Sequence, residues 1–187
     1  MNYRYITLKG KNKKYFTKKN TNIRKILIRK LIEVIYDDEI IVFLDETTFN
    51  QRNKRIKAWR SLNDKNDYPE EGIIKRLNLI LAVTKNEIIY YEYYTENTNT
   101  LVFTNIFEKI LIAIKMNMKY NKLLQNNKIC FYLDNATYHH GKVLMNFFFL
   151  NNLKIIFGAP YSCEYNLCEY IFSYIKNKYS KTSFTCL

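Results

Sequence analysis

Short apolar segments with the length of strands occupy the centre of the chain, and after residue 100 they alternate with stretches of helical periodicity. Strands are expected at 40–45, 55–60, 74–84, 87–94, 128–133 and 154–157. Helices are expected at 21–36, with Thr21 as N-cap, and at 100–116, 138–150 and 167–179. This order predicts an α/β fold, a mixed sheet that starts with three antiparallel strands and carries helices on both faces.

Length and composition fit one domain with a sizeable core, because the chain has 187 residues of which 48% are hydrophobic. No apolar run approaches the roughly 18 residues of a transmembrane helix, so no membrane partner is expected. The four cysteines form no C-x-x-C pair and there are only two histidines, so we expect a reduced intracellular protein without a structural zinc site.

The charge balance favours a polyanionic partner. The chain carries 30 Lys and Arg against 17 Asp and Glu, a net charge of +13, and binding to phosphates releases counterions. Abundant Asn, Lys and Ile are typical of AT-rich coding DNA, which raises the lysine count without selection for binding. Arginine is the better bidentate phosphate ligand. The candidate DNA-binding residues are Arg52, Arg55, Arg60 and Lys176.

Three acidic residues are the candidate catalytic groups. Asp45 and Asp134 each follow an apolar segment, and Glu169 lies in the last predicted helix. A carboxylate at the end of a strand projects from the sheet, and two or three carboxylates suffice to bind Mg²⁺. Two ions roughly 3.5–4 Å apart can hold the attacking and leaving oxygens of a phosphodiester displacement. Taken singly, each acid also fits an ordinary turn, N-cap or surface position.

Three segments around these acids resemble a known family. They are Leu44-Asp45-Glu46-Thr47-Thr48-Phe49, Leu133-Asp134-Asn135-Ala136-Thr137-Tyr138-His139, and Ala159-Pro160-Tyr161-Ser162 through Asn166 to Glu169. Their order, with 34 residues between the last two acids, is similar to the signature blocks of mariner-type and bacterial insertion-sequence DDE transposases, over roughly residues 40–178. The resemblance implies an RNase H-like catalytic domain that uses Mg²⁺ or Mn²⁺, two ions, to cut transposon ends and join them to target DNA. Asp45, Asp134 and Glu169 fall on its catalytic and metal-binding triad.

Two residues next to the second acid are candidates for the border of the site. Asn135 follows Asp134, and His139 lies about one helical turn further on. The Asn-x-x-x-His pattern recurs in the resembling family, so His139 is a candidate to contact the scissile phosphate or assist proton transfer. The alternative is a histidine that caps or packs against its own helix. Glu46 and Glu164 are interpreted as bystanders.

The third block departs from the family pattern, because Cys163 and Leu167 stand where prolines are usual. Proline fixes φ and suits the first turn of a helix, so its loss loosens the loop before Glu169. The polar stretch 61–72 is interpreted as a surface loop, with a homodimer contact as the alternative.

The domain organisation predicted is a basic lead-in and linker helix at 1–38 and a catalytic domain at 39–187. Only 44 residues precede Asp45, which leaves no room for paired helix-turn-helix modules. The predicted function is that of a DDE transposase catalytic domain, a metal-dependent endonuclease acting in the nucleus of a eukaryote or the cytoplasm of a bacterium. The alternatives are a non-catalytic, transposon-derived DNA-binding or assembly protein, and another RNase H-like nuclease, which the third block disfavours.

Overall fold

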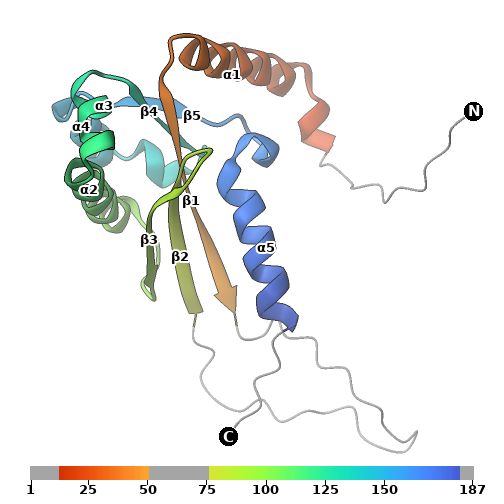
Figure 1. Ribbon diagram of the computed structural model, residues 1–187. Coiled ribbons are helices and arrows are strands. Elements are labelled where there is room, and N and C mark those ends of the chain that lie inside the picture. Colours follow the sequence, from red (N-terminus) through yellow and green to blue (C-terminus); the bar gives the residue numbers. More distant parts are fainter. Residues whose placement is uncertain (1–12, 51–75, 182–187) are drawn as a thin grey trace, which may run out of the picture.

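A mixed sheet forms the centre of the computed structural model, which describes residues 13–50 and 76–181 (Figure 1). Within these residues the sheet order is β3-β2-β1-β4-β5. Strands β1, β2 and β3 pair in antiparallel fashion, whereas β4 pairs parallel to both β1 and β5. The strands are β1 (Ile40–Asn50), β2 (Arg76–Val83), β3 (Ile88–Tyr94), β4 (Ile129–Leu133) and β5 (Lys154–Phe157). This is the predicted α/β architecture.

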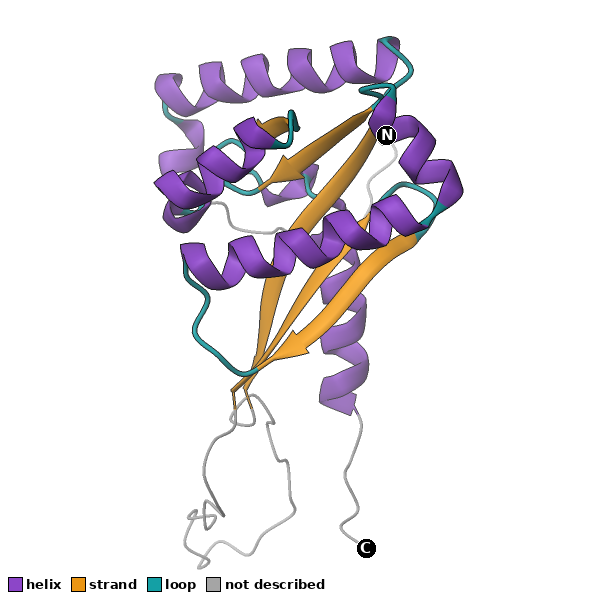
Figure 2. Ribbon diagram, turned by 90° about the vertical axis from the view of Figure 1, so that its left-hand side faces the viewer, coloured by secondary structure: helices purple, strands orange, loops and turns teal. Residues whose placement is uncertain are grey.

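Helices cover both faces of the sheet (Figure 2). They are α1 (Lys18–Tyr36), α2 (Thr100–Met116), α3 (Met118–Gln125), α4 (Lys142–Leu150) and α5 (Leu167–Lys181). The main core lies on the α2 face, where Phe107 of α2 packs with Leu44 of β1 and Phe131 of β4. On the opposite face α5 packs on β1 and β2, and α1 covers β4 and β5 through Leu27. Side chains therefore alternate between two buried layers along β1.

Strand β1 is longer than predicted. The expected strand ended at residue 45, but β1 continues to Asn50 because β2 pairs with it from Phe43 through Asn50. The parallel pairing with β4 stops earlier, at Leu44 with Leu133. Asp45 is thus not the end of its strand, which corrects the prediction. It is the first residue of β1 beyond the part that β4 covers.

Two predicted helices also differ in their boundaries. The N-cap of α1 is Thr17, whose side chain accepts a hydrogen bond from the backbone of Asn20, so the helix starts before the predicted cap Thr21. The expected helix 138–150 is divided into a 3₁₀ turn, η3 (Thr137–His140), and α4. Gly141 separates them, and a Cβ there would lie 2.3 Å from the side chain of Thr100, so the close approach of α2 requires glycine.

One α-helix of the described residues was not predicted, and some predictions lie outside those residues. Helix α3 follows Asn117, whose side chain accepts from the backbone N–H groups of Lys119 and Tyr120. The strand expected at 55–60 and the loop 61–72 fall outside 13–50 and 76–181. Over those two described ranges, no helix has both the length and the apolar character needed to cross a membrane.

Candidate active site

The register of the sheet brings the first two acids together. Leu44 of β1 pairs with Leu133, the last residue of β4, so Asp45 is the next residue of β1 and Asp134 is the first residue after β4. The charge of Asp134 acts on the carboxyl of Asp45, as does that of Glu169. The three predicted acids therefore share one electrostatic environment at the point where β4 ends and β1 continues.

Asp45 is a buried carboxyl with 8% of its surface exposed. Its Oδ1 accepts a hydrogen bond of 2.7 Å from the backbone N–H of Glu46, and its Oδ2 accepts one of 2.8 Å from Nδ2 of Asn166. Burial and the neighbouring charges of Glu46, Asp134 and Glu169 raise the pKa of Asp45 to about 8. Without a cation this carboxyl is mostly protonated at neutral pH.

Helix α5 supplies the third acid. Asn166 precedes the helix, and its Oδ1 accepts from the backbone N–H of Cys168, which is an N-cap contact. Because Nδ2 of the same side chain bonds Asp45, the start of α5 is tied to the middle of β1. Cys168 is buried against Phe43 and Leu81. Glu169 follows it, exposed in the first turn of the helix.

Asp134 has a different environment from Asp45. Its side chain is half exposed, at 48%, and its Oδ1 lies 2.8 Å from Nδ1 of His139 and 3.1 Å from the backbone nitrogen of Ala136. Burial favours a higher pKa, but the contact with His139 outweighs it and holds the pKa of Asp134 below its ordinary value. The carboxylate is therefore ionised, and one of its two oxygens is engaged by the protein.

His139 borders the site from inside the core. The ring is fully buried, with centroid distances of 4.3 Å to Phe103 and 4.4 Å to Tyr138. Burial lowers its pKa, but the carboxylates of Asp134 and Glu46 dominate and raise the pKa to about 9. The ring has no exposed surface in this structure, so a contact of His139 with the scissile phosphate stays a prediction.

The other predicted border residues lie at the surface. Asn135 is exposed, and its Oδ1 is 2.7 Å from Nε2 of His140, which was not among the predicted site residues. Lys176 is exposed on α5, seven residues after Glu169 and thus on the same side of the helix. Arg52, Arg55 and Arg60 lie outside the described residues.

The donor set suits a hard divalent cation, since Asp45, Asp134 and Glu169 offer carboxylate oxygens. The raised pKa of Asp45 has burial as its largest cause and the charges of neighbouring acids as further ones, and a bound cation would offset both by favouring the ionised carboxylate. Across residues 13–50 and 76–181, however, no three acidic, histidine or cysteine side chains converge closely enough to form a ready-made metal site. Metal binding would therefore require the three carboxylates to move closer together.

Two site residues were missed by the sequence interpretation. Asn166 stood in the third block but was given no role, although an Asn just before a helix is a common N-cap. Glu46 was interpreted as a bystander, yet its side chain is only 8% exposed and its Oε1 lies 3.9 Å from Nε2 of His139. No signal in the local sequence indicates either contact, because the partner residues are far away along the chain.

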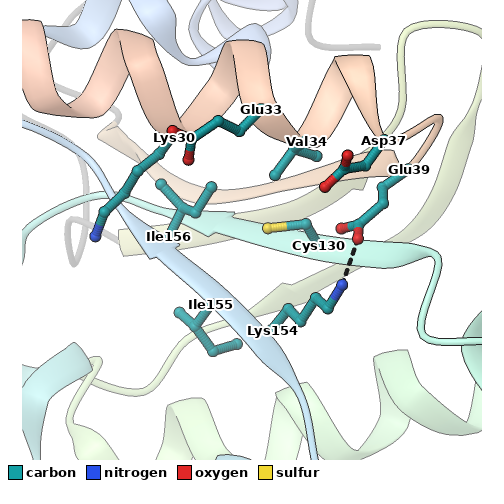
Figure 3. Close-up of a pocket in the computed structure, with 9 residues that line it drawn as sticks. All are labelled: Lys30, Glu33, Val34, Asp37, Glu39, Cys130, Lys154, Ile155 and Ile156. Carbon is teal, nitrogen blue, oxygen red and sulfur yellow. Dashed lines mark hydrogen bonds and ion pairs between the residues drawn. The ribbon is translucent and has the colours of Figure 1, made fainter.

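A surface cavity of about 360 Å³ lies elsewhere, between α1 and strands β4 and β5 (Figure 3). Cys130 lies at its centre, and Glu39 and Lys154 form an ion pair on its wall. None of the three candidate acids lines this cavity. It is therefore separate from the candidate active site.

The sequence model of the DDE superfamily endonucleases matches residues 40–187, which include all three acids. The chain belongs to this family. A search of curated proteins gives no match for this DDE endonuclease. The match confirms the family resemblance drawn from the three sequence blocks.

Solved structures of Mos1 mariner transposase share the fold of this DDE endonuclease. The Mos1 paired end complex with Mn superposes with a TM-score of 0.73 at 17% identity, over 99% of this chain and 56% of that one. The Mos1 catalytic domain superposes with a TM-score of 0.65 at 16% identity, over 97% and 79%. The predicted RNase H-like fold is thereby confirmed. The chain spans just over half of the Mos1 chains in the paired end complexes.

Proposed function

We propose that this DDE endonuclease is the catalytic domain of a DNA transposase that cuts phosphodiester bonds at transposon ends and joins them to target DNA. The observation that carries the proposal is the pairing of Leu44 with Leu133, which places Asp45 and Asp134 at adjacent positions while Asn166 ties the helix of Glu169 to Asp45. The fold shared with Mos1 complexes described as a paired end complex and a strand transfer complex supports DNA as the partner.

Mg²⁺ or Mn²⁺, as two ions, is the proposed cofactor, and Asp45, Asp134 and Glu169 are its proposed ligands. Support comes from the carboxylate donor set and from Mos1 structures described with Mn and with Mg. Once bound, the cations supply Lewis acidity that stabilises the attacking and leaving oxygens of an in-line displacement.

The chain's own residues prepare the site for this chemistry. Asp45 gives up its proton, because a carboxyl must be ionised to act as a ligand. Asn166 and the backbone of Glu46 keep the Asp45 carboxylate oriented. Asp134 is already ionised and held by His139 through Oδ1, which leaves Oδ2 for a ligand role. In the first step water attacks a phosphodiester at the transposon end, the bond from phosphorus to the 3′-oxygen breaks, and a 3′-hydroxyl and a 5′-phosphate result. In the second step that 3′-hydroxyl attacks a phosphodiester of target DNA and displaces the 3′-oxygen of the target strand.

The test is the nicking of a supercoiled plasmid by the purified protein in Mg²⁺ or Mn²⁺. Asp45→Asn, Asp134→Asn and Glu169→Gln each remove a charged ligand, so each is expected to reduce nicking to background while duplex DNA affinity stays equal or rises slightly. Glu108→Gln, an exposed acid of α2 on the opposite face, is the matched control and should nick like wild type. Nicking that survives all three site changes would contradict the proposal.

A second candidate function is that of a non-catalytic, transposon-derived DNA-binding or assembly protein. It is favoured by the lack of a three-ligand convergence within the described ranges 13–50 and 76–181, where Asp134 is held by His139 instead. This function predicts that wild type binds DNA but does not nick it in either metal. In both cases the protein acts on DNA, in the nucleus of a eukaryote or the cytoplasm of a bacterium.

A further inference from the structure

Glu46 is a carboxylate buried in the main core, next to the active site but on the other face of the sheet. Successive residues of a strand point to opposite faces, so Glu46 faces α2 whereas Asp45 faces α5. Its cross-strand neighbour is Ile80, a residue of the α2-facing core. With 8% of its side chain exposed, Glu46 needs polar partners, because burying an unpartnered carboxylate is costly.

The partners of Glu46 both come from the 3₁₀ turn η3. The hydroxyl of Tyr138 donates a hydrogen bond of 3.3 Å to Oε2 of Glu46. The other oxygen, Oε1, lies 3.9 Å from Nε2 of His139, which is longer than a hydrogen bond but within the range of an ion pair. Neither Oε1 nor Nε2 has any other hydrogen-bond partner among the described residues. These two buried atoms therefore face one another.

The second nitrogen of the His139 ring faces Asp134. Nδ1 lies 2.8 Å from Oδ1 of Asp134 and 3.1 Å from its backbone oxygen. Phe103 and Tyr138 pack against the ring, so it has no room to turn away. The imidazole thus connects the buried carboxylate of β1 with the carboxylate at the end of β4.

We propose that Glu46 is a positioning residue, which orients His139 and through it sets the direction of the Asp134 carboxylate at the metal site. Buried partners behind a ligand commonly fix its orientation in this way, and their loss costs about 10- to 100-fold in metal affinity or activity. The inference rests on the proposed function, because it assumes that Asp134 is a metal ligand. It also reverses the interpretation of Glu46 as a bystander.

The chain offers a matched control on the same face of the sheet. Ile80 pairs with Glu46 on one side and with Glu92 of β3 on the other. Oε2 of Glu92 likewise accepts a hydrogen bond of 2.6 Å from the hydroxyl of Tyr90, but its Oε1 forms an ion pair with Lys109 at 2.6 Å where Oε1 of Glu46 faces His139. Glu46→Gln and Glu92→Gln therefore make the same chemical change in the same row of the sheet, and only the first acts on His139.

The experiment measures Mn²⁺ binding to the DNA-free protein by electron paramagnetic resonance of the free ion. Glu46→Gln is expected to weaken Mn²⁺ binding by about 10- to 100-fold, whereas Glu92→Gln binds like wild type. Tyr138→Phe, which removes only the hydroxyl that holds Glu46, should weaken binding by a smaller factor and serves if Glu46→Gln fails to fold. Raising the Mn²⁺ concentration should restore nicking by Glu46→Gln but not by Glu169→Gln, which lacks a ligand.

A spectroscopic readout separates positioning from general support of the core. The chain has two histidines, so the ring nitrogen signals of His139 and His140 can be resolved by NMR. Glu46→Gln should shift the His139 signals and leave those of His140 unchanged. Wild type that binds no Mn²⁺ would overturn both this inference and the proposed function. Wild type that binds Mn²⁺, with Glu46→Gln and Tyr138→Phe binding it equally well, would overturn the role of Glu46 alone.

Discussion

Individual residues of the site differ in charge before any cation binds. Asp45 is buried and carries a proton at neutral pH, whereas Asp134 is half exposed and ionised beside His139. The two aspartates thus differ in protonation state because their environments differ. Cation binding must displace the Asp45 proton, so affinity for Mg²⁺ or Mn²⁺ should rise as the pH rises toward 8.

From the raised pKa of Asp45 we predict how the stability of the metal-free protein depends on pH. A carboxyl with a folded pKa of about 8 and an ordinary value of 3.8 stabilises the fold at low pH, and this contribution is lost as pH rises through 8. Asp45→Asn stays neutral, so its Tm in EDTA should exceed that of wild type by an amount that grows between pH 5 and pH 9. In a chain of this size, each 1 kcal/mol of free energy of unfolding corresponds to roughly 2–4 °C in Tm.

Thermal denaturation across that pH range checks the expectation, with Glu108→Gln as the control that follows wild type. Added Mn²⁺ should raise the Tm of wild type and leave that of Asp45→Asn unchanged. A Tm difference that does not depend on pH would contradict a raised pKa at this position.

The sequence indicated which acidic residues form the candidate site, but not which other side chains contact them. Asp45, Asp134 and Glu169 were predicted from local patterns and family blocks. The contact of Asn166 with Asp45 spans 121 residues, and that of Tyr138 with Glu46 spans 92. Such contacts depend on strand register and on how η3 packs against the rest of the fold. No local sequence pattern encodes either of these.

Elements with strong end signals were predicted closely. Helix α2 begins after Asn99, whose side chain caps it, and its bounds match the expected 100–116. Strand β5 also matches its expected bounds, 154–157. Strand β1 was predicted too short because polar residues after Leu44 resemble a turn, while pairing with β2 keeps them in the sheet. Tertiary pairing there outweighs local preference.

The two positions that lack the expected prolines differ in backbone geometry. Asn166, before Leu167, has φ −101° and ψ 116°, close to the extended region that a residue before proline prefers. Ser162, before Cys163, has φ −124° and ψ 48°, which lies outside that region. Leu167 is also the first residue of α5, where proline leaves no intrahelical hydrogen bond unmade.

Leu167→Pro should therefore be tolerated, with a Tm within about 2 °C of wild type, because reduced freedom of the unfolded chain offsets the lost leucine packing. Cys163→Pro should lower the Tm by about 2–4 °C or more, since the preceding backbone must move. Thermal denaturation of the two single variants gives the comparison. Equal losses at both positions would show that the backbone before residue 167 does not favour proline.

At the scale of the whole molecule, the net charge of +13 favours binding to a polyanion without specifying a sequence. The residues most suited to phosphate contact by type, Arg52, Arg55 and Arg60, lie outside the described residues. Lys176 is the one candidate basic residue within them, exposed on the side of α5 that carries Glu169. Duplex DNA is thus expected to approach the site along this helix.

The protein should bind duplex DNA weakly and with little sequence preference. Neutralising about four phosphates would cost roughly 100-fold in affinity between 50 and 200 mM salt. Fluorescence anisotropy with two unrelated duplexes measures both the salt dependence and the preference. Lys176→Gln should weaken binding to both duplexes alike and lower the salt slope by roughly one. Tight, salt-resistant selection of one duplex would contradict an interaction dominated by charge.

The contacts of the Asn166 side chain have a consequence for the newly synthesised chain. Because this side chain both caps α5 and bonds Asp45, the helix that carries Glu169 is held beside Asp45 only after a residue late in the chain has contacted a strand near its start. Contacts of such long sequence separation form late in folding. On the proposed function, a chain in which α5 has not yet docked is therefore expected to lack the third metal ligand and to leave DNA uncut.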